Sequence, residues 1–356
     1  MYKLFKKRYT PEFLTQIPHK ASFQLKTESF GHKFNENWRL FRREISLCMS
    51  GQKFLERGNI PENTQRILWI ATSIKNIGDA VMAFSGRKLL IDKGYQLDVL
   101  LDEKVYLLFI NDDWFSQVYT DVSQIDANYD LILLDSVKSI SLKTKKKYFS
   151  KVPYCHFRGH FDGIEFNWIL YSFHRINALL GYPCEQKELD CMAFPELKKI
   201  KSEVVENQLV IAVGGEDEKR RVYDKWVEVV DKLLIKYPQL TIILAGNANA
   251  LSDADKISGV FGDRVINKVN MLNLAEAAQL IASSGYFLGC DGGLMHIASG
   301  YGLKGVALFG YFEPEYRLPL FSHLTAVYDE SSVKNIPVDQ ISQKLIELIA
   351  KGVQDD

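Results

Sequence analysis

Short, largely apolar runs occur in two successive sets along the chain and limit the folds it can adopt. The first set comprises residues 66–71 (RILWIA), 97–101 and 130–135, and a segment of helical character at 79–93 lies between the first two runs. Continuous apolar runs of this length are typical of strands buried on both faces of a parallel sheet. Their alternation with helices predicts a doubly wound α/β domain.

The same pattern begins again after residue 200. The strand-like runs are 209–213, 240–245, 286–289 and 305–309. One helical segment ends near Tyr237, and three others cover 274–284, 294–301 and 337–351. We therefore predict an α/β protein with two Rossmann-like doubly wound domains facing a cleft, with ligands bound beyond the carboxyl ends of the strands. The predicted parts are an N-terminal extension at 1–65, domains at 66–190 and 191–335, and a C-terminal helix at 336–356.

The charge of the chain is unevenly distributed although the net charge is zero. Residues 1–66 contain 13 Lys and Arg against 6 Asp and Glu, a balance of +7. Since the whole chain has 44 of each kind, the remainder has 31 basic against 38 acidic residues. A basic N-terminal arm suggests contact with an anionic surface, either membrane phosphates or nucleic acid. The structural alternative is a solvated, partly helical extension, with an amphipathic helix expected at 38–54.

Compartment signals in the sequence are few. No stretch approaches the roughly 18 apolar residues of a spanning helix, and the start of the chain has basic residues without the apolar region of a secretory signal. The five cysteines are scattered without metal-type spacing or a disulfide framework; they are Cys48, Cys155, Cys184, Cys191 and Cys290. These features predict a cytoplasmic protein.

The stretch 289–310 (GCDGGLMHIASGYGLKGVALFG) is the most informative motif. Glycines here turn the backbone sharply from a strand into a helix, and the free amides at a helix start form an anion site. Asp291 can accept hydrogen bonds from ligand hydroxyls, and His296 can donate to a sugar or phosphate. The structural alternatives remain open: Asp291 as the N-cap of that helix and His296 as a satisfied buried histidine.

This stretch resembles the D-[TS]-G-x-x-H-[LI]-A-A-x-x-G-x-x-x-V-A-L-F-G signature of glycosyltransferase family 9, the ADP-heptose transferases of lipopolysaccharide core assembly. Gly292 stands where the family has Thr or Ser. Residues 72–81 resemble the family's L-S-S-[IM]-G-D-V-[VL], and 214–226 resemble its P-G-[AS]-x-x-x-x-K-R-W-P pattern, with Val222 after a second arginine in place of the Trp-Pro pair. Similarity covers residues 66–319 and implies a GT-B-type fold.

The resemblance implies a role for particular residues. Asp79 corresponds to the general base that deprotonates the acceptor hydroxyl; its structural alternative is a helix N-cap, worth about 1 kcal/mol. Lys219 would neutralise the donor diphosphate, with a solvated basic turn as the alternative. The expected donor-binding residues are Gly214, Gly215, Lys219, Arg220, Asp291, Gly292, Gly293, Leu294 and His296.

Acceptor contacts are expected in the N-terminal domain. The candidates are Gly78, Lys138 and Arg158. The basic run 143–147 and the aromatic and cationic stretch 154–160 could hold a phosphorylated glycolipid, with plain solvated loops as the alternative reading.

Other chemistries lack their motifs. Asp253-Ala-Asp255 has the letters of a metal-binding Asp-x-Asp but lies in a polar, helix-like stretch, and we find neither a Walker A loop nor Gly-x-Gly-x-x-Gly after the first strand. We predict an inverting, metal-independent transferase without a cofactor. The resemblance implies ADP-heptose as donor and lipid A–core or a related glycan as acceptor, at the cytoplasmic face of the inner membrane and without nucleic acid. A sugar-nucleotide epimerase of the same fold and a degenerate glycan-assembly binding protein are the alternatives.

Overall fold

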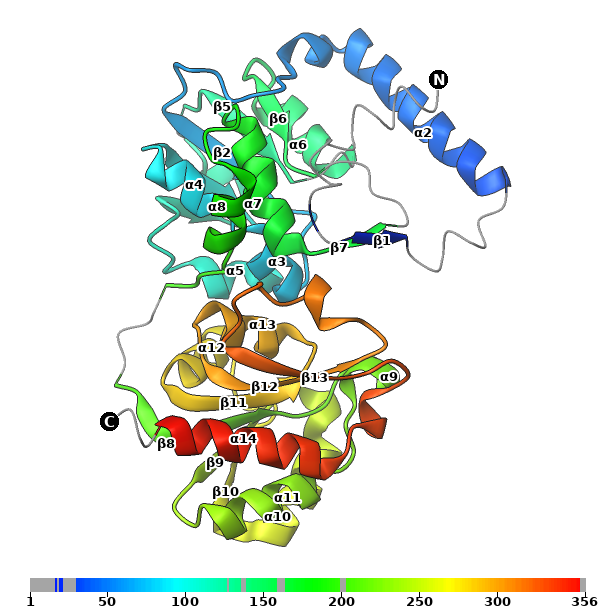
Figure 1. Cartoon of the computed structure of the whole chain (residues 1–356). Helices are drawn as coiled ribbons and strands as arrows, with labels where there is room; N and C mark the ends of the chain where they lie inside the picture. The colour runs from blue at the N-terminus through cyan, green and yellow to red at the C-terminus, as the bar shows by residue number, and fades with distance from the viewer. Residues whose placement is uncertain are drawn as a thin grey trace. The chain divides into compact units, whose positions relative to one another are not determined.

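A computed structural model of the chain describes residues 17, 19–21, 30–126, 128–135, 139–158, 164–198 and 203–352. The chain divides into two compact units, one of residues 1–75 and 83–193 and the other of residues 76–82 and 194–356. Each unit contains a parallel sheet with helices packed against it (Figure 1). The predicted α/β class with two doubly wound domains is therefore confirmed.

The first unit is built on a five-stranded parallel sheet. Its strands are β2 (Arg66–Ile70), β3 (Gln96–Leu100), β4 (Gln117–Tyr119), β5 (Leu131–Leu134) and β6 (Tyr154–His156). Their spatial order is β4-β3-β2-β5-β6. Every residue of β5 is buried, as are the last four of β2, because helices and loops cover both faces of a parallel sheet. The three runs predicted as strands in this half form its centre.

Helices of the first unit surround this sheet. They are α2 (Phe30–Met49), η3 (Gln52–Leu55), α4 (Arg87–Asp92), α5 (Glu103–Phe109), η4 (Val122–Gln124), α6 (Ser139–Tyr148), α7 (Trp168–Leu179) and α8 (Gln186–Met192). A short antiparallel pair joins β1 (His19–Ala21) to β7 (Ile164–Phe166). The helix expected at 79–93 is two helices, α3 (Ile77–Ala83) and α4. They are separated at Gly86, where an added Cβ would lie 2.6 Å from the Ser172 carbonyl oxygen of α7.

The second unit has a six-stranded parallel sheet. Its strands are β8 (Val205–Ala212), β9 (Thr241–Ala245), β10 (Val265–Asn267), β11 (Ser284–Cys290), β12 (Lys304–Gly310) and β13 (Leu324–Asp329), in the order β10-β9-β8-β11-β12-β13. Its helices are α9 (Glu218–Arg221), α10 (Trp226–Lys236), η5 (Ala248–Ala250), α11 (Leu251–Phe261), η6 (Gly262–Arg264), α12 (Leu274–Ala282), α13 (Gly293–Gly300), η7 (Pro314–Tyr316), η8 (Val333–Asn335) and α14 (Val338–Gly352).

Side chains at alternate strand positions form the core on one face of this sheet. Leu209 and Ile211 of β8 pack there with Leu288 of β11, together with Leu233 of α10 and Leu345 of α14. Alternation places every second side chain of a strand on the same face. The amphipathic C-terminal helix predicted at 337–351 is thus part of the core of this unit.

Lys145 is a buried cation in the first unit. Its ammonium donates a hydrogen bond to the side-chain oxygen of Gln52 and lies 4.8 Å from the centre of the Tyr154 ring. Burial lowers the pKa of Lys145 from 10.5 to about 8, because the charged form loses its hydration. The folded chain therefore releases this proton at a lower pH than the unfolded chain does.

We expect this lysine to make folding stability depend on pH. From about pH 8 to 10.5 the unfolded state holds a proton that the folded state has lost, so the free energy of unfolding rises with pH over this range. The rise is on the order of 3 kcal/mol. In urea unfolding, the free energy of unfolding of the wild type should therefore rise from pH 7 to 10 relative to that of Lys145→Met. Lys143→Met, at an exposed position of the same helix, serves as the control; parallel curves for Lys145→Met and the wild type would refute the expectation.

Candidate active site

The strand order of the second unit places a topological switch point at its carboxyl edge. Strand β8 lies between β9 and β11, so the connections that follow β8 and β11 leave the sheet in opposite directions. Ligands of doubly wound sheets bind at such a switch point. The loop after β8 contains Gly214 and Gly215, and the turn after β11 contains Asp291, Gly292 and Gly293. The two motifs singled out in this half of the sequence therefore follow neighbouring strands.

Asp291 is a buried carboxylate at this edge, with 2% of its surface exposed. Arg220 Nη2 lies 2.7 Å from its Oδ2, and His296 Nε2 lies 3.6 Å from its Oδ1. Burial opposes the ionised form, but the interaction with His296 and the charges of Arg317 and Arg220 outweigh it and hold the pKa of Asp291 well below its ordinary value. Asp291 is therefore an ionised group that fixes an arginine and a histidine.

The start of α13 lacks a side-chain cap. Gly292 occupies the N-cap position in an extended conformation, and no side chain there accepts a hydrogen bond from the helix amides. The alternative interpretation of Asp291 as the N-cap is thus wrong, because its oxygens face Arg220 and His296. An uncapped helix start directs N–H groups and the positive end of the helix dipole outward, which suits an anionic ligand.

Three further buried nitrogen atoms, in α9 and α13, lack a hydrogen-bond partner within the described residues. Arg220 Nε, Arg221 Nε and His296 Nδ1 are buried and make no hydrogen bond within the described ranges. Buried N–H groups are normally hydrogen-bonded. Two unpaired arginine N–H groups and an unpaired ring nitrogen of His296 therefore indicate a site whose polar groups are completed by a polar ligand.

The glycines after β8 are needed for close packing. Gly214 has φ +80°, and a Cβ there would lie 2.6 Å from the Cβ of Ala250. A Cβ on Gly215 would overlap the Cβ of Arg221 in α9. The short loop therefore brings α9, and with it Arg220, close to the strand ends. Lys219 lies in the same helix, but its side chain is outside the described part of the structure.

Gly292 differs from these glycines because space surrounds it. A Cβ there would meet only the Cys290 carbonyl oxygen, at 3.6 Å, an ordinary van der Waals contact. Its φ of −159° is open to any residue. Packing therefore does not demand glycine where the family has a hydroxyl residue. Neighbouring Gly293 and Leu294 begin the helix itself and are half-buried.

An aromatic ring after β12 was not predicted from the sequence. The Arg220 guanidinium carbon lies 4.0 Å from the centre of the Phe312 ring, and that of Arg317 lies 5.0 Å from it. Tyr311, directly before, has φ +66°, an uncommon backbone conformation for a bulky residue. A bend immediately after a buried strand places Phe312 against Arg220. In the sequence, the only indication of this contact is the aromatic pair Tyr311-Phe312 directly after Gly310.

The first unit has its own switch point, between β2 and β5. Asp135 follows β5 and is fully buried. One carboxylate oxygen accepts a hydrogen bond from the Ser73 amide at 2.8 Å, and the other accepts one from Ser141 Oγ at 2.6 Å. Asp135 therefore fixes the loop that follows β2, which leads directly to Asp79. Its role could not be read from the sequence spacing.

Asp79 is the third residue of α3 and is half-buried. Its carboxylate accepts a hydrogen bond from Asn76 Nδ2 at 3.0 Å. The N-cap position belongs to Asn76, whose carbonyl accepts the first helical hydrogen bond, from Ala80. The alternative interpretation of Asp79 as an N-cap is therefore wrong. One carboxylate oxygen is held by Asn76, which leaves the other for a further partner.

Residues 76–82 belong to the second compact unit, so the start of α3 lies against α13. A Cβ on Gly78 would overlap the His296 ring, and a Cβ on Gly293 would lie 3.1 Å from the Cβ of Ile77. Glycine at both positions permits this close approach. The segment that carries Asp79 is thus packed against the helix that begins next to Asp291.

The other predicted acceptor residues have different surroundings. Arg158 follows β6, and its guanidinium carbon lies 4.2 Å from the centre of the Trp168 ring. Lys138 lies outside the described residues. The solvated-loop interpretation is wrong for residues 143–147, which are in α6, and for 154–156, which form the buried strand β6. The basic run and the three-residue strand each carry too weak a periodic pattern to be recognised.

Two further findings concern metals and membranes. Within the described ranges, no three His, Cys, Asp or Glu side chains lie together as they would around a metal ion. The helices of those ranges include none that is long and apolar enough to cross a bilayer. Asp253 and Asp255 lie in α11, as the sequence predicted for a polar helix.

Comparisons with known proteins agree with this architecture. The family described as glycosyltransferase family 9 (heptosyltransferase) matches residues 174–343. The ADP-heptose lipopolysaccharide heptosyltransferase II of E. coli is 17% identical, with a TM-score of 0.61, and the match covers 81% of this chain and 100% of that one. No curated protein sequence matches the chain.

Two further solved structures have the same fold. A family 9 glycosyltransferase from Veillonella parvula is 13% identical with a TM-score of 0.63, covering 82% of this chain and 99% of that one. The E. coli heptosyltransferase WaaC with ADP is 13% identical with a TM-score of 0.61, covering 80% and 99%. Residues 174–343 thus match the glycosyltransferase family 9 model, and the chain has the two-domain fold of the solved heptosyltransferases.

Proposed function

We propose that the chain transfers a heptose from ADP-heptose to a lipopolysaccharide core or related glycan acceptor, with inversion and without a metal ion, at the cytoplasmic face of the inner membrane. The observation that carries the proposal is ionised Asp291 with Arg220 and His296 beside the uncapped start of α13. A nucleoside diphosphate offers the negative charge and acceptor oxygens that such donors require. Solved heptosyltransferases of the same fold contain ADP or an ADP-heptose analogue, which supports the choice of donor.

The chemistry follows from the charges of these groups. Asp79 takes the proton of the acceptor hydroxyl, and the oxygen attacks the anomeric carbon from the face opposite the nucleotide. The bond from that carbon to the diphosphate oxygen breaks, and negative charge develops on the leaving group. Arg220 and the amides of Gly293 and Leu294 stabilise this charge from fixed positions, and the charge of Lys219 adds to them, a role that a divalent cation has in other transferases.

Donor binding is the first test of the proposal. ADP-heptose should raise the melting temperature of the chain, and a ligand at 100 times its Kd stabilises the folded state by about 2.7 kcal/mol. A panel of nucleotide sugars with other bases and other sugars is the control for selectivity. Equal stabilisation by every member of the panel would contradict the choice of donor.

Turnover separates the proposal from its rivals. With ADP-heptose and a Kdo- or heptose-ended lipid A–core acceptor, transfer should continue in the presence of EDTA, and NMR of the product should show the inverted anomeric configuration. Conversion of the donor without any acceptor would indicate an epimerase. Donor binding without turnover would indicate a binding protein. Loss of activity in EDTA would show that the enzyme requires a metal ion.

A further inference from the structure

The second half of helix α2 is anchored to the first unit by one face. Leu47 is fully buried in the core beside β2 and β5. Lys53 of η3 ties the helix to the chain that follows, because its ammonium lies 2.6 Å from Glu44 and 3.0 Å from Glu56. The orientation of this half of α2 on the unit is therefore fixed by contacts.

The opposite face of α2 exposes large apolar side chains. Trp38, Phe41, Ile45 and Met49 are spaced by three or four residues and so lie along one side of the helix. Met49 is 85% exposed, and Phe54 of η3, just beyond the end of α2, is 81% exposed. A contiguous exposed apolar stripe of this kind marks a surface that meets a partner or a membrane.

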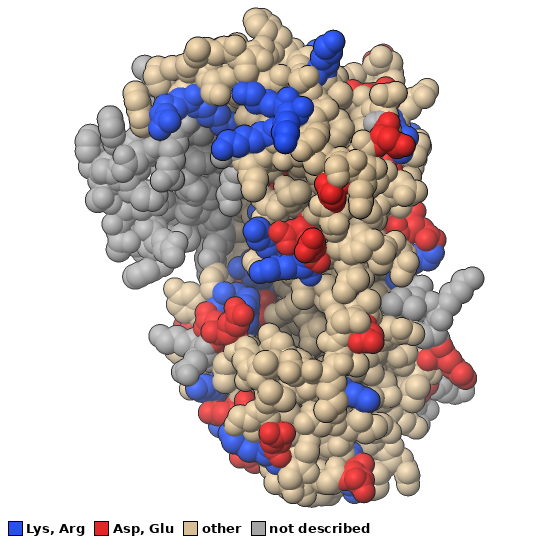
Figure 2. All heavy atoms as spheres, turned by 180° about the vertical axis from the view of Figure 1, so that it is seen from behind, with Lys and Arg blue, Asp and Glu red and all other residues tan. Residues whose placement is uncertain are grey.

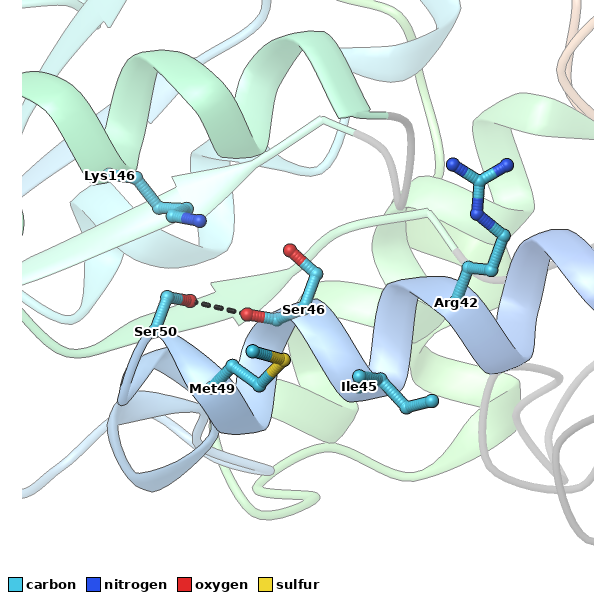
Figure 3. Close-up of a pocket in the computed structure, with 6 residues that line it drawn as sticks. All are labelled: Arg42, Ile45, Ser46, Met49, Ser50 and Lys146. Atoms are coloured by element: carbon cyan, nitrogen blue, oxygen red, sulfur yellow. Dashed lines mark hydrogen bonds between the residues drawn. The ribbon is translucent and has the colours of Figure 1, made fainter.

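A hollow between α2 and α6 adjoins this stripe and has a volume of about 410 Å³. Its lining residues are Arg42, Ile45, Ser46, Met49, Ser50 and Lys146. Figure 3 shows Lys146 extending from α6 toward Ser46 and Ser50, with Arg42 one turn away along α2. The hollow thus combines two cations and two hydroxyls with apolar side chains at its border, and none of its lining residues is acidic.

The surrounding charge is positive as well. Helix α6 contains four lysines and no acidic residue, and Lys143 and Lys147 are exposed. The carboxylates of Glu44 and Glu56 are both bound by Lys53. In the space-filling view, Lys and Arg side chains gather over the region of α2 and α6 without acidic side chains among them (Figure 2). This charge is complementary to an anionic surface.

We propose that this α2 surface, defined by Arg42, Ile45, Met49, Phe54 and Lys146, docks onto a bilayer of anionic phospholipids. Arg42, Lys146 and the serine hydroxyls bind lipid phosphate, while the apolar side chains enter the boundary between headgroups and acyl chains. Helices with an apolar face and cationic flanks lie in the membrane plane in this way. The inference extends the proposed function, because a lipid-linked acceptor would be reached from such a surface.

Vesicle co-sedimentation of the full chain tests the docking without any sugar substrate. The chain should bind phosphatidylglycerol-containing vesicles, bind pure phosphatidylcholine vesicles at least tenfold more weakly, and lose binding as salt increases. Arg42→Gln with Lys146→Gln should weaken binding about fivefold for each cation removed. Met49→Ser with Phe54→Ser should weaken it by about tenfold or more.

Matched controls lie on the second unit. Ile235→Ser with Met271→Ser removes two exposed apolar side chains, and Lys256→Gln with Lys268→Gln removes two cations. Both control variants should bind vesicles like the wild type. The proposal would be overturned if the α2 variants bound vesicles as tightly as the wild type does. It would also be overturned if free glycerol phosphate prevented vesicle binding as effectively as added vesicles do. A concentration-dependent dimer lost in Met49→Ser would overturn it too, because it would assign the surface to a second copy.

Donor binding by each variant, measured by calorimetry, distinguishes this inference from the proposed function. The α2 variants should bind ADP-heptose like the wild type, because the donor site is built from residues of the second unit. If ADP-heptose fails to bind while vesicle docking persists, the proposed function fails and the membrane surface stands. The reverse result removes the membrane surface alone.

Discussion

Replacing Asp79 with asparagine is expected to lower turnover by a factor of about 10² to 10⁴, the range for loss of a general base. The amide has the shape of the carboxylate but cannot take the proton from the hydroxyl of the acceptor sugar. Asn76 already holds one oxygen of Asp79 at 3.0 Å, so the carboxylate is oriented before substrate arrives. Steady-state kinetics should show the loss in kcat, with donor affinity nearly unchanged in calorimetry.

A first-turn aspartate elsewhere provides the control for this variant. Asp253 lies in the first turn of α11 and, like Asp79, carries a partner on its carboxylate, the Lys256 ammonium at 3.2 Å. Asp253→Asn should leave turnover unchanged. If Asp79→Asn retained wild-type kcat, Asp79 would be only a structural residue of the helix start, and the base would have to be sought elsewhere.

The sheets could be predicted because their central strands are unambiguous. Residues 67–70 and 131–134 are apolar throughout, and a run this short and apolar fits a buried strand better than any surface element. The three-residue strands β4, β6 and β10 carry too few positions for a period to be visible. Gly86 lies in the break between α3 and α4, and its close approach to α7 is a tertiary contact that the local sequence does not specify.

The candidate site could be predicted in part. The glycine turn and Asp291 were found because a motif contains them within a few residues. Arg220 lies 71 residues earlier in the chain, and its ion pair with Asp291 follows from the adjacency of β8 and β11, which the sequence does not specify. Asp135 beside Ser73 follows in the same way from the adjacency of β5 and β2, and Phe312 beside Arg220 depends on the position of β12 next to β11. Pairings between loops of neighbouring strands require the strand order.

Replacing Arg220 with glutamine is expected to weaken ADP-heptose binding and to destabilise the fold together. Asp291 is 2% exposed, so loss of Arg220 leaves a buried carboxylate without its ion-pair partner, compensated only by His296 and the charge of Arg317. Breaking a buried ion pair costs about 3 to 5 kcal/mol, and the partial exposure of Arg220 favours the lower end. Urea unfolding gives the stability change, and calorimetry with ADP-heptose gives the change in affinity.

A second buried pair allows the two effects to be separated. Arg87 and Asp112 lie 2.6 Å apart in the first unit and are almost fully buried. Arg87→Gln should therefore lower stability by a comparable amount but leave donor affinity unchanged in the folded protein. Asp291→Asn combined with Arg220→Gln should recover part of the lost stability, because no charge is then left unpaired. Donor affinity should stay low in this double variant. Wild-type affinity in either Arg220 variant would show that Arg220 only balances Asp291 and that other groups bind the diphosphate.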